Sequence, residues 1–259
     1  MKALTEQKRR VRDFWNEQPC GTRDNPHPPD SPAYFEWVEQ ARDTREPFIA
    51  RFARWPAWRG RRVLEMGVGA GTDFVKFARA GAHVTGVDLS ERSAALARTR
   101  VRGERRRAQV AISDVENLPF PDATFDFVYS WGVIHHTQDT PAAAREIVRV
   151  LRPGGQFAVM IYHRRSLLCL QAYLVYGLGR GRPFRSIDDI AREHLESYGT
   201  KVYTRRAAAA LFPGIPVTIT NVLTPYDVRI GRTRFLPAAV RRLIPDYLGY
   251  FLVIEGQKP

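Results

Sequence analysis

The alternation of apolar and polar residues divides the chain into strands and helices that follow one another in turn. Short apolar runs typical of buried strands occur at residues 63–64, 82–87, 109–112, 125–129 and 156–162. Segments with helical periodicity lie between these runs, at residues 72–80, 90–102 and 140–151. Ser90 is placed to cap the second helix, and Thr140-Pro141 is expected to cap and begin the third. Strands that alternate with helices predict an α/β fold around a mostly parallel sheet.

The flanking segments have a different pattern. Residues 5–18 carry Val11, Phe14 and Trp15 among charged neighbours, which predicts an amphipathic helix, and a second helix is expected at 32–52. Residues 163–213 have a mainly helical pattern. A minimal fold would need only one short crossover between the strands at this point. Runs at 217–220 and 250–255 predict two closing strands, with the last one antiparallel. We therefore predict an N-terminal helical arm (1–59), a core (60–162 and 214–259) and a helical cap over an acceptor pocket (163–213), and we assign no pattern to 224–248.

Composition limits the class of protein. The chain has 259 residues and 44% hydrophobic residues, as expected of an ordinary globular α/β domain with additions. Cys20 and Cys169 are too few and too far apart for a disulfide framework or a cysteine metal site. The polar, basic N-terminus does not have the pattern of a secretory signal. The longest apolar run, Leu167 to Leu178, is shorter than the ~20 residues of a membrane span. These features predict a cytoplasmic location.

The net charge of +13 raises the question of nucleic-acid binding. The chain has 40 basic residues, of which 35 are arginines. The densest arginine cluster, residues 98–107, falls at the end of a predicted helix, opposite the sheet edge where ligands bind in this class of fold. We therefore expect solvated surface arginines rather than a nucleic-acid interface, and an RNA-modifying enzyme stays open as an alternative.

A glycine turn follows the first strand. Gly67, Gly69 and Gly71 have the spacing G-x-G-x-G, and Thr72 occupies the position at which a dinucleotide fingerprint needs its third Gly or Ala. Glu65 lies two residues before the first glycine, where its charge would repel a phosphate and would suit a cationic ligand. The next strand ends at Asp88, which points toward the crevice and is suited to bind ribose hydroxyls.

This stretch resembles the class I S-adenosylmethionine-dependent methyltransferases, in particular the small-molecule type similar to those of ubiquinone and menaquinone biosynthesis. Three further matches support the resemblance: Asp-Val-Glu-Asn-Leu-Pro-Phe at 114–120, the segment 130–136, and Leu-x-Pro-Gly-Gly at 151–155. The resemblance covers residues 60–163 well and the last two strands loosely. It implies a Rossmann-like, doubly wound sheet with an antiparallel last strand, and S-adenosylmethionine as cofactor, with S-adenosylhomocysteine as product.

The family resemblance also implies roles for individual residues. Glu65 would hold the amino end of the cofactor, the glycine turn its methionine portion, Asp88 its ribose, and Asp114 with Val115 its adenine. The implied cofactor-binding residues are Glu65, Gly67, Gly69, Gly71, Asp88, Leu89, Asp114, Val115, Ser130 and Trp131.

The catalytic and acceptor residues are less constrained. His135 and His136 follow the fourth strand and could provide a general base or a substrate contact, although packing at the strand end would also explain them. A metal is not expected, because adjacent side chains diverge and no partner lies at i+4. The remaining candidates for acceptor contacts are Trp15, Tyr34, Tyr162, His163, Tyr198 and Tyr203.

These features predict methyl transfer to a C, N or O atom of a small, partly apolar acceptor, in secondary or isoprenoid-quinone-like metabolism. Two alternatives stay open: a reaction that uses the bound cofactor without methyl transfer, and RNA methylation. A nicotinamide-dependent oxidoreductase is disfavoured by Thr72 and Glu65.

Overall fold

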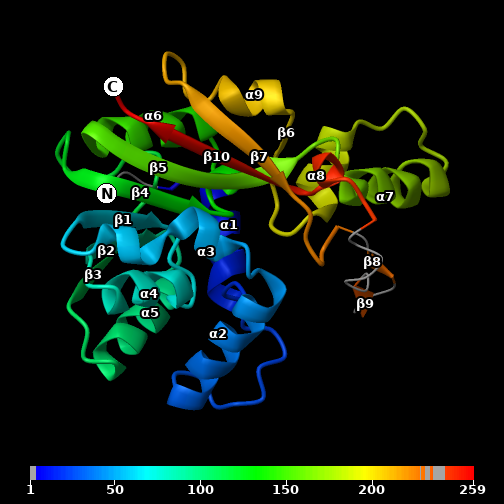
Figure 1. Cartoon of the computed structure of the whole chain (residues 1–259). Helices are drawn as coiled ribbons and strands as arrows, with labels where there is room; N and C mark the ends of the chain where they lie inside the picture. The colour runs from blue at the N-terminus through cyan, green and yellow to red at the C-terminus, as the bar shows by residue number, and fades with distance from the viewer. Residues whose placement is uncertain (1–3, 228, 231–233, 236–242) are drawn as a thin grey trace.

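The computed structural model of the chain describes residues 4–227, 229–230, 234–235 and 243–259 and is organised around one mixed sheet (Figure 1). The strand order in this sheet is β3-β2-β1-β4-β5-β10-β7, and β6 pairs with one end of β5. The strands are β1 (Arg62–Met66), β2 (His83–Asp88), β3 (Ala108–Ile112), β4 (Phe125–Trp131), β5 (Leu151–His163), β6 (Val202–Tyr203), β7 (Val217–Val222) and β10 (Phe251–Gln257). β8 (Arg229–Ile230) and β9 (Arg234–Phe235) form a separate pair.

The sheet confirms the predicted fold class. Strands β1 to β6 pair in parallel, whereas β10 is antiparallel to both β5 and β7. After β1, the chain adds β2 and then β3 on one side of β1. It then returns to form β4 on the other side of β1. In doubly wound sheets ligands bind at such a reversal, outside the carboxyl ends of the strands. The sheet therefore has a binding edge at the ends of β1, β2 and β4.

Helices cover both faces of the sheet, because successive strand residues point to opposite sides. Val63 and Phe127 pack on the face of α3 (Ile49–Ala53), α4 (Thr72–Arg79) and α5 (Glu91–Gly103). Leu64 and Val128 pack on the opposite face, against α6 (Thr140–Val150) and α9 (Arg205–Ala209). Figure 1 shows these two layers below and above the sheet.

Some predicted boundaries were wrong. The helix expected at 32–52 is two helices, α2 (Pro32–Arg45) and α3, because Pro47 lacks an N–H and cannot continue α2. The N-cap of α6 is Asp139, whose side chain accepts from the Ala142 N–H, so Thr140 is already helical. The strand expected at 156–162 begins earlier, at Leu151, and the pairing of β5 with β4 shifts register between Phe125 and Phe127.

The segment 163–213 contains α7 (Leu167–Tyr176), η3 (Leu178–Arg180), α8 (Ile187–His194), β6 and α9. α7 and α8 pack on one another to one side of the sheet (Figure 1). α9 instead covers the sheet through Ala208, and β6 was not predicted. The segment is therefore mixed rather than wholly helical. None of the helices in the described part of the chain combines the length and apolar character needed to cross a bilayer.

The prediction that the arginines at 98–107 are solvated was wrong for two of them. Arg98 donates to the Val110 carbonyl at 2.9 Å. Arg100 is only 2% exposed, bonds Glu39, and donates to Thr72 Oγ1 at 3.1 Å. Both guanidinium groups therefore hold α5 to its neighbours, while Arg106 and Arg107 are exposed.

Candidate functional site

A cavity of about 1240 Å³ opens at the binding edge of the sheet. One end, which we call the glycine end, is lined by Gly67, Gly69, Asp88 and Asp114. The other, the aromatic end, is lined by Tyr162, Tyr176, Tyr226, Tyr250 and Phe251. Side chains of α1 (Glu6–Glu17) and α2 cover the cavity, so the arm contributes to the site.

The glycine turn brings backbone into the cavity. Gly67, Gly69 and Gly71 have φ of 77°, 51° and 76°, a region in which side chains are strained. A Cβ on Gly67 would lie 2.2 Å from Val133, and one on Gly71 would lie 3.0 Å from the backbone of α5. A Cβ on Gly69 would meet only Cys20, at 3.9 Å, and would project into the cavity. Gly67 and Gly71 thus allow close packing, whereas Gly69 leaves room for a ligand.

Asp88 lies at the end of β2 beside the glycine turn. Its carboxylate accepts hydrogen bonds from the Gly69 N–H at 3.0 Å and the Ser90 N–H at 2.9 Å. Burial raises the pKa of Asp88 to about 6, against the opposing effect of these backbone donors. Asp88 and Leu89 both line the cavity, so the carboxylate combines a fixed orientation with access to a ligand.

Buried acidic residues outnumber buried bases between the two ends of the cavity. Glu65 and Asp73 are each 4% exposed, and Asp73 accepts from Arg42 at 2.7 Å and from the Tyr129 hydroxyl at 3.1 Å. Glu65 Oε2 has no hydrogen-bond partner in the described residues. Burial and the neighbouring Asp73 charge raise the pKa of Glu65 well above its usual value. An uncompensated acid of this kind is stabilised by a cation.

A third buried acid, Glu46, continues this arrangement toward the aromatic end. It accepts from Trp131 Nε1 and from the Tyr226 hydroxyl, both at 3.1 Å, and lies 3.6 Å from Arg42. One arginine therefore faces three carboxyl groups across this part of the cavity wall, and all four residues line the cavity.

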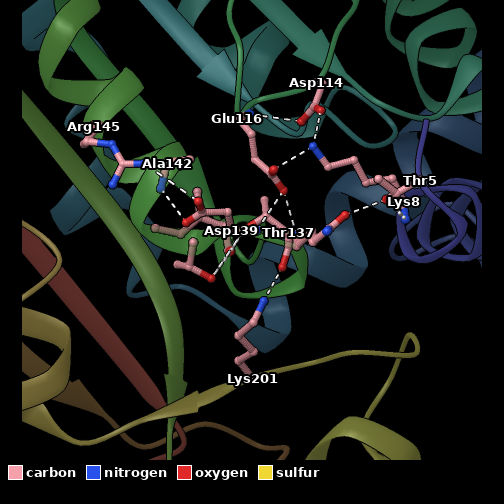
Figure 2. A network of polar contacts seen from close by, with 12 residues as sticks. Thr5, Lys8, Asp114, Glu116, Thr137, Asp139, Ala142, Arg145 and Lys201 are labelled. Carbon is pink, nitrogen blue, oxygen red and sulfur yellow. Dashed lines mark hydrogen bonds and ion pairs between the residues drawn. The ribbon is translucent and has the colours of Figure 1, made fainter. Parts of the chain in front are cut away.

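The arm is fastened to the glycine end at both ends of α1. Lys8 donates to Asp114 at 2.5 Å and lies 2.6 Å from Glu116, as Figure 2 shows. Glu116 in turn accepts from the backbone N–H of Gln138 and of Asp139. Near the other end of α1, Asn16 accepts from Ser90 Oγ at 2.7 Å. α1 therefore spans the strand ends that carry Asp88 and Asp114.

His136 forms the centre of a polar group at the aromatic end. Its Nδ1 lies 2.8 Å from Ser197 Oγ and 3.1 Å from Thr200 Oγ1, and its Nε2 lies 3.4 Å from a Glu196 oxygen. The Tyr162 hydroxyl donates to the same carboxylate. His136, Glu196 and Tyr162 all line the cavity.

His135 occupies a different environment. It is fully buried beneath Tyr162, with ring centroids 3.9 Å apart, and it is absent from the cavity lining. Burial lowers the pKa of His135 well below its usual value, so the ring is neutral. Ligand atoms of His135, His136 and Glu196 lie within 4.8 Å of one another, a grouping that could hold a metal. The carboxylate comes from a distant segment, so helical spacing around the two histidines does not reveal it.

The structure brings only some of the predicted residues to the cavity. Trp15, Trp131, Tyr162, Asp114 and Val115 line it. Ser130 is fully buried within β4, and Tyr34 packs beside Phe35 in the arm. His163 is buried, with Nδ1 3.1 Å from the Gly249 carbonyl and 3.0 Å from Asn221.

Tyr198 and Tyr203 also lie outside the main cavity. Tyr198 is 46% exposed, with Arg10 over its ring at 5.0 Å. Tyr203 lines a small separate pocket next to Lys201. Their assignment to acceptor contacts stays a prediction.

Several residues of the site were not found from the sequence, namely Lys8, Arg42, Glu46, Asp73, Glu196 and Tyr226. Asp73 lies in the first turn of α4, two residues after the last glycine, and this position could have indicated a cavity residue. The others come from the arm, the cap and the segment before β10, where no local pattern marks them.

Comparison with known proteins agrees with this geometry. A family model described as a methyltransferase domain matches residues 64–159. Demethylmenaquinone methyltransferase of Tropheryma whipplei is 32% identical over 177 residues, which cover 62% of this chain and 72% of that protein. Phosphoethanolamine N-methyltransferase of Triticum aestivum is 31% identical over 130 residues, half of this chain and 26% of that enzyme. The match thus spans about a quarter of the length of the wheat enzyme.

A solved structure extends the likeness to the whole fold. Geranyl diphosphate C-methyltransferase from Streptomyces coelicolor A3(2), determined with S-adenosyl-L-homocysteine, superposes with a TM-score of 0.68 at 17% identity. The superposition covers 99% of this chain and all of that one. The superposition therefore includes the N-terminal arm (1–59) and the segment 163–213 as well as the core.

Proposed function

The chain belongs to the class I S-adenosylmethionine-dependent methyltransferases, and on this basis we propose that it transfers a methyl group from S-adenosylmethionine to a small, partly apolar acceptor. The observation that carries the proposal is the excess of buried acid in the cavity wall. Glu46, Glu65 and Asp73 face the single cation of Arg42, and Glu65 Oε2 has no hydrogen-bond partner in the described residues. A ligand with an ammonium and a sulfonium group relieves this imbalance, whereas a dinucleotide pyrophosphate would worsen it.

The other residues of the glycine end fit the same cofactor. Asp88 can accept from ribose hydroxyls, and Asp114 from the adenine amine, with the Val115 N–H available to a ring nitrogen. Gly69 leaves space where a side chain would project into the cavity. Bound S-adenosylmethionine supplies an electrophilic methyl group, so the protein has chiefly to align the acceptor and exclude water.

The aromatic end suits an acceptor with an apolar body. Its walls include Met160, Leu168, Tyr250 and Phe251, with polar groups gathered at Glu196 and His136. Such a lining favours a ring or an isoprenoid over a small zwitterion. Among the acceptors that the relatives' names indicate, a quinone-like molecule therefore fits better than phosphoethanolamine.

His136 is our candidate for removing a proton from the acceptor. The Thr200 hydroxyl donates its proton to the Ser197 carbonyl, so its oxygen is free to accept from His136 Nδ1–H. This tautomer leaves Nε2 as the basic nitrogen, next to the Glu196 carboxylate. A nearby carboxylate stabilises the imidazolium that forms when the base takes up a proton.

Thermal unfolding in the presence of candidate cofactors tests the proposal. A ligand that binds only the folded state raises the Tm, so S-adenosylmethionine and S-adenosylhomocysteine should do so and NAD and NADP should not. The Glu65→Gln variant should respond less to both sulfur ligands, because it loses the carboxyl group that can pair with the ammonium group of either ligand. A rise with a nicotinamide cofactor alone would contradict the proposal.

We do not expect the exposed arginines to bind RNA. The alternative of an RNA methyltransferase predicts an affinity for RNA that falls steeply with salt concentration. The expected cytoplasmic location can be checked by fractionation of cells that express the protein. The atom that receives the methyl group is to be identified by mass spectrometry of the product.

A further inference from the structure

The outer side of α7 is apolar and faces solvent. The sequence of α7, Leu-Leu-Cys-Leu-Gln-Ala-Tyr-Leu-Val-Tyr, contains no charged residue, and a helix that is apolar all round is normally buried on all sides. Here Leu168, Cys169 and Ala172 are buried, whereas Leu170 and Leu174 are 52% and 50% exposed. Leu178, in the following η3, is 47% exposed. Leu170 and Leu174 are four residues apart and form an apolar stripe on one side of α7, and Leu178 follows in η3, after the C-cap of α7 at Gly177.

The loop after α7 adds a fully exposed aromatic residue to this stripe. Phe184 is 99% exposed. The loop folds back on the end of α7, because the Arg182 N–H donates to the Gly177 carbonyl at 2.8 Å and the Tyr173 hydroxyl to the Pro183 carbonyl at 2.7 Å. Apolar side chains therefore extend from α7 into the α7–α8 loop.

Positive charge accompanies this apolar surface. No Asp or Glu occurs between His163 and Asp188, a stretch that contains five arginines. Arg164 pairs with Asp188 and Arg185 with Glu193. Arg165, Arg180 and Arg182 are exposed and make no ion pair among the residues that the structure describes.

We propose that this face, formed by Leu170, Leu174, Leu178, Phe184, Arg180 and Arg182, docks the protein onto the surface of an anionic lipid bilayer. Exposed apolar side chains insert at the boundary between headgroups and acyl chains, and neighbouring arginines bind the anionic headgroups. Charge complementarity favours this occupant, because a second copy of this face would bring the positive charges of Arg180 and Arg182 in both copies together. The short apolar run of α7 suits a helix that lies in the interface rather than one that spans the bilayer.

The docking face and the cavity share a helix. The inner side of α7 contributes Gln171, Ala172 and Tyr176 to the cavity lining, and Val175, which is 50% exposed, also lines the cavity. A bilayer held against α7 would lie next to the aromatic end, so an acceptor dissolved in the membrane would have a short route into the cavity. This consequence rests on the proposed function, whereas docking itself does not.

Co-sedimentation of the whole protein with lipid vesicles tests the proposal. The wild-type protein should bind vesicles of phosphatidylcholine mixed with phosphatidylglycerol, and should bind phosphatidylcholine alone much less. The Arg180→Ala/Arg182→Ala variant should lose about fivefold in vesicle affinity per arginine. Leu170→Ser/Leu174→Ser and Phe184→Ser should each lose roughly tenfold.

Matched variants provide the controls. Arg106→Ala/Arg107→Ala removes two exposed arginines from the loop between α5 and β3 and should bind vesicles as the wild type does. Leu170→Met/Leu174→Met keeps the apolar surface and should also bind. The Tm shift with S-adenosylhomocysteine should be unchanged in every variant, which separates a failure of docking from a failure of the proposed function.

Three results would overturn the proposal. The first is a wild-type protein that does not bind anionic vesicles at low salt. The second is an arginine control pair that loses as much affinity as Arg180→Ala/Arg182→Ala, which would show diffuse adsorption of a basic protein. The third is a dimer, seen by sedimentation, that dissociates in Leu170→Ser/Leu174→Ser without vesicle binding, which would assign the face to a second copy.

Discussion

The glycine end of the cavity is built from a nearly continuous stretch of chain, whereas the aromatic end is assembled from distant segments. Glu65, Gly69, Asp88 and Asp114 lie within 50 residues, at the ends of three adjacent strands. The aromatic end combines residues of β4, β5 and the cap with Tyr226, Tyr250 and Phe251. At the first end the backbone of one turn lines the cavity, and at the second side chains from separate elements do so. The relatives' names indicate different acceptors, phosphoethanolamine and demethylmenaquinone.

The largest effect is expected from a side chain at the centre of the glycine turn. Gly69→Val should abolish measurable binding of S-adenosylhomocysteine, a loss of more than about 100-fold, because the side chain projects into the cavity and φ is +51°. Isothermal titration calorimetry measures the loss. Gly214→Val is the matched control, since Gly214 has φ +76° and no atom lies within 4 Å of the position that a Cβ would take. Normal binding by Gly69→Val would show that the turn is structural only.

The next effect concerns the aromatic end alone. His136→Ala should lower kcat by about 10²- to 10⁴-fold if the acceptor must lose a proton, and should leave the Kd of the cofactor unchanged. Glu196→Gln should lower kcat less, because it removes only the stabilisation of the imidazolium. Steady-state kinetics with an identified acceptor measures both. An equal loss of cofactor binding in His136→Ala would mean that the two ends of the cavity do not act separately.

A third prediction uses the acidity of Asp88. Its pKa of about 6 means that the carboxyl group is protonated, and a poorer acceptor for ribose hydroxyls, below that pH. The Kd of S-adenosylhomocysteine should therefore be constant above pH 6 and rise toward tenfold per pH unit below it. The Asp88→Asn variant should bind more weakly throughout and lose this dependence. A wild-type profile that is flat from about pH 5 to 7 would contradict the assigned role.

The smallest effect is expected from the arm. Lys8→Met removes the contacts of α1 with Asp114 and Glu116, so α1 should open more readily. Association and dissociation rates of S-adenosylhomocysteine should both increase, while the Kd changes by less than about fivefold, as is usual for a partly exposed ion pair. Stopped-flow tryptophan fluorescence follows the rates, with Trp15 on α1 as a local probe. Arg9→Met, a change on the same helix at a side chain that contacts only Leu4 and Glu6 of the arm among the described residues, is the control, and unchanged rates in Lys8→Met would show that the arm does not gate the site.

The sequence alone determined the order of the elements in the core and the position of the glycine end. Strand and helix periodicity is local, and a glycine turn between a strand and a helix lies at the carboxyl ends of the strands in a doubly wound sheet, so Gly69 and Asp88 could be placed at that edge without a structure. The arm, the cap and the choice between His135 and His136 could not, because each depends on packing between segments far apart in the chain. Only the tertiary structure brought Lys8 to Asp114 and Glu196 to His136, over separations of 106 and 60 residues. Only the tertiary structure, too, left one side of α7 uncovered, since an apolar helix sequence does not record which of its faces another element will bury.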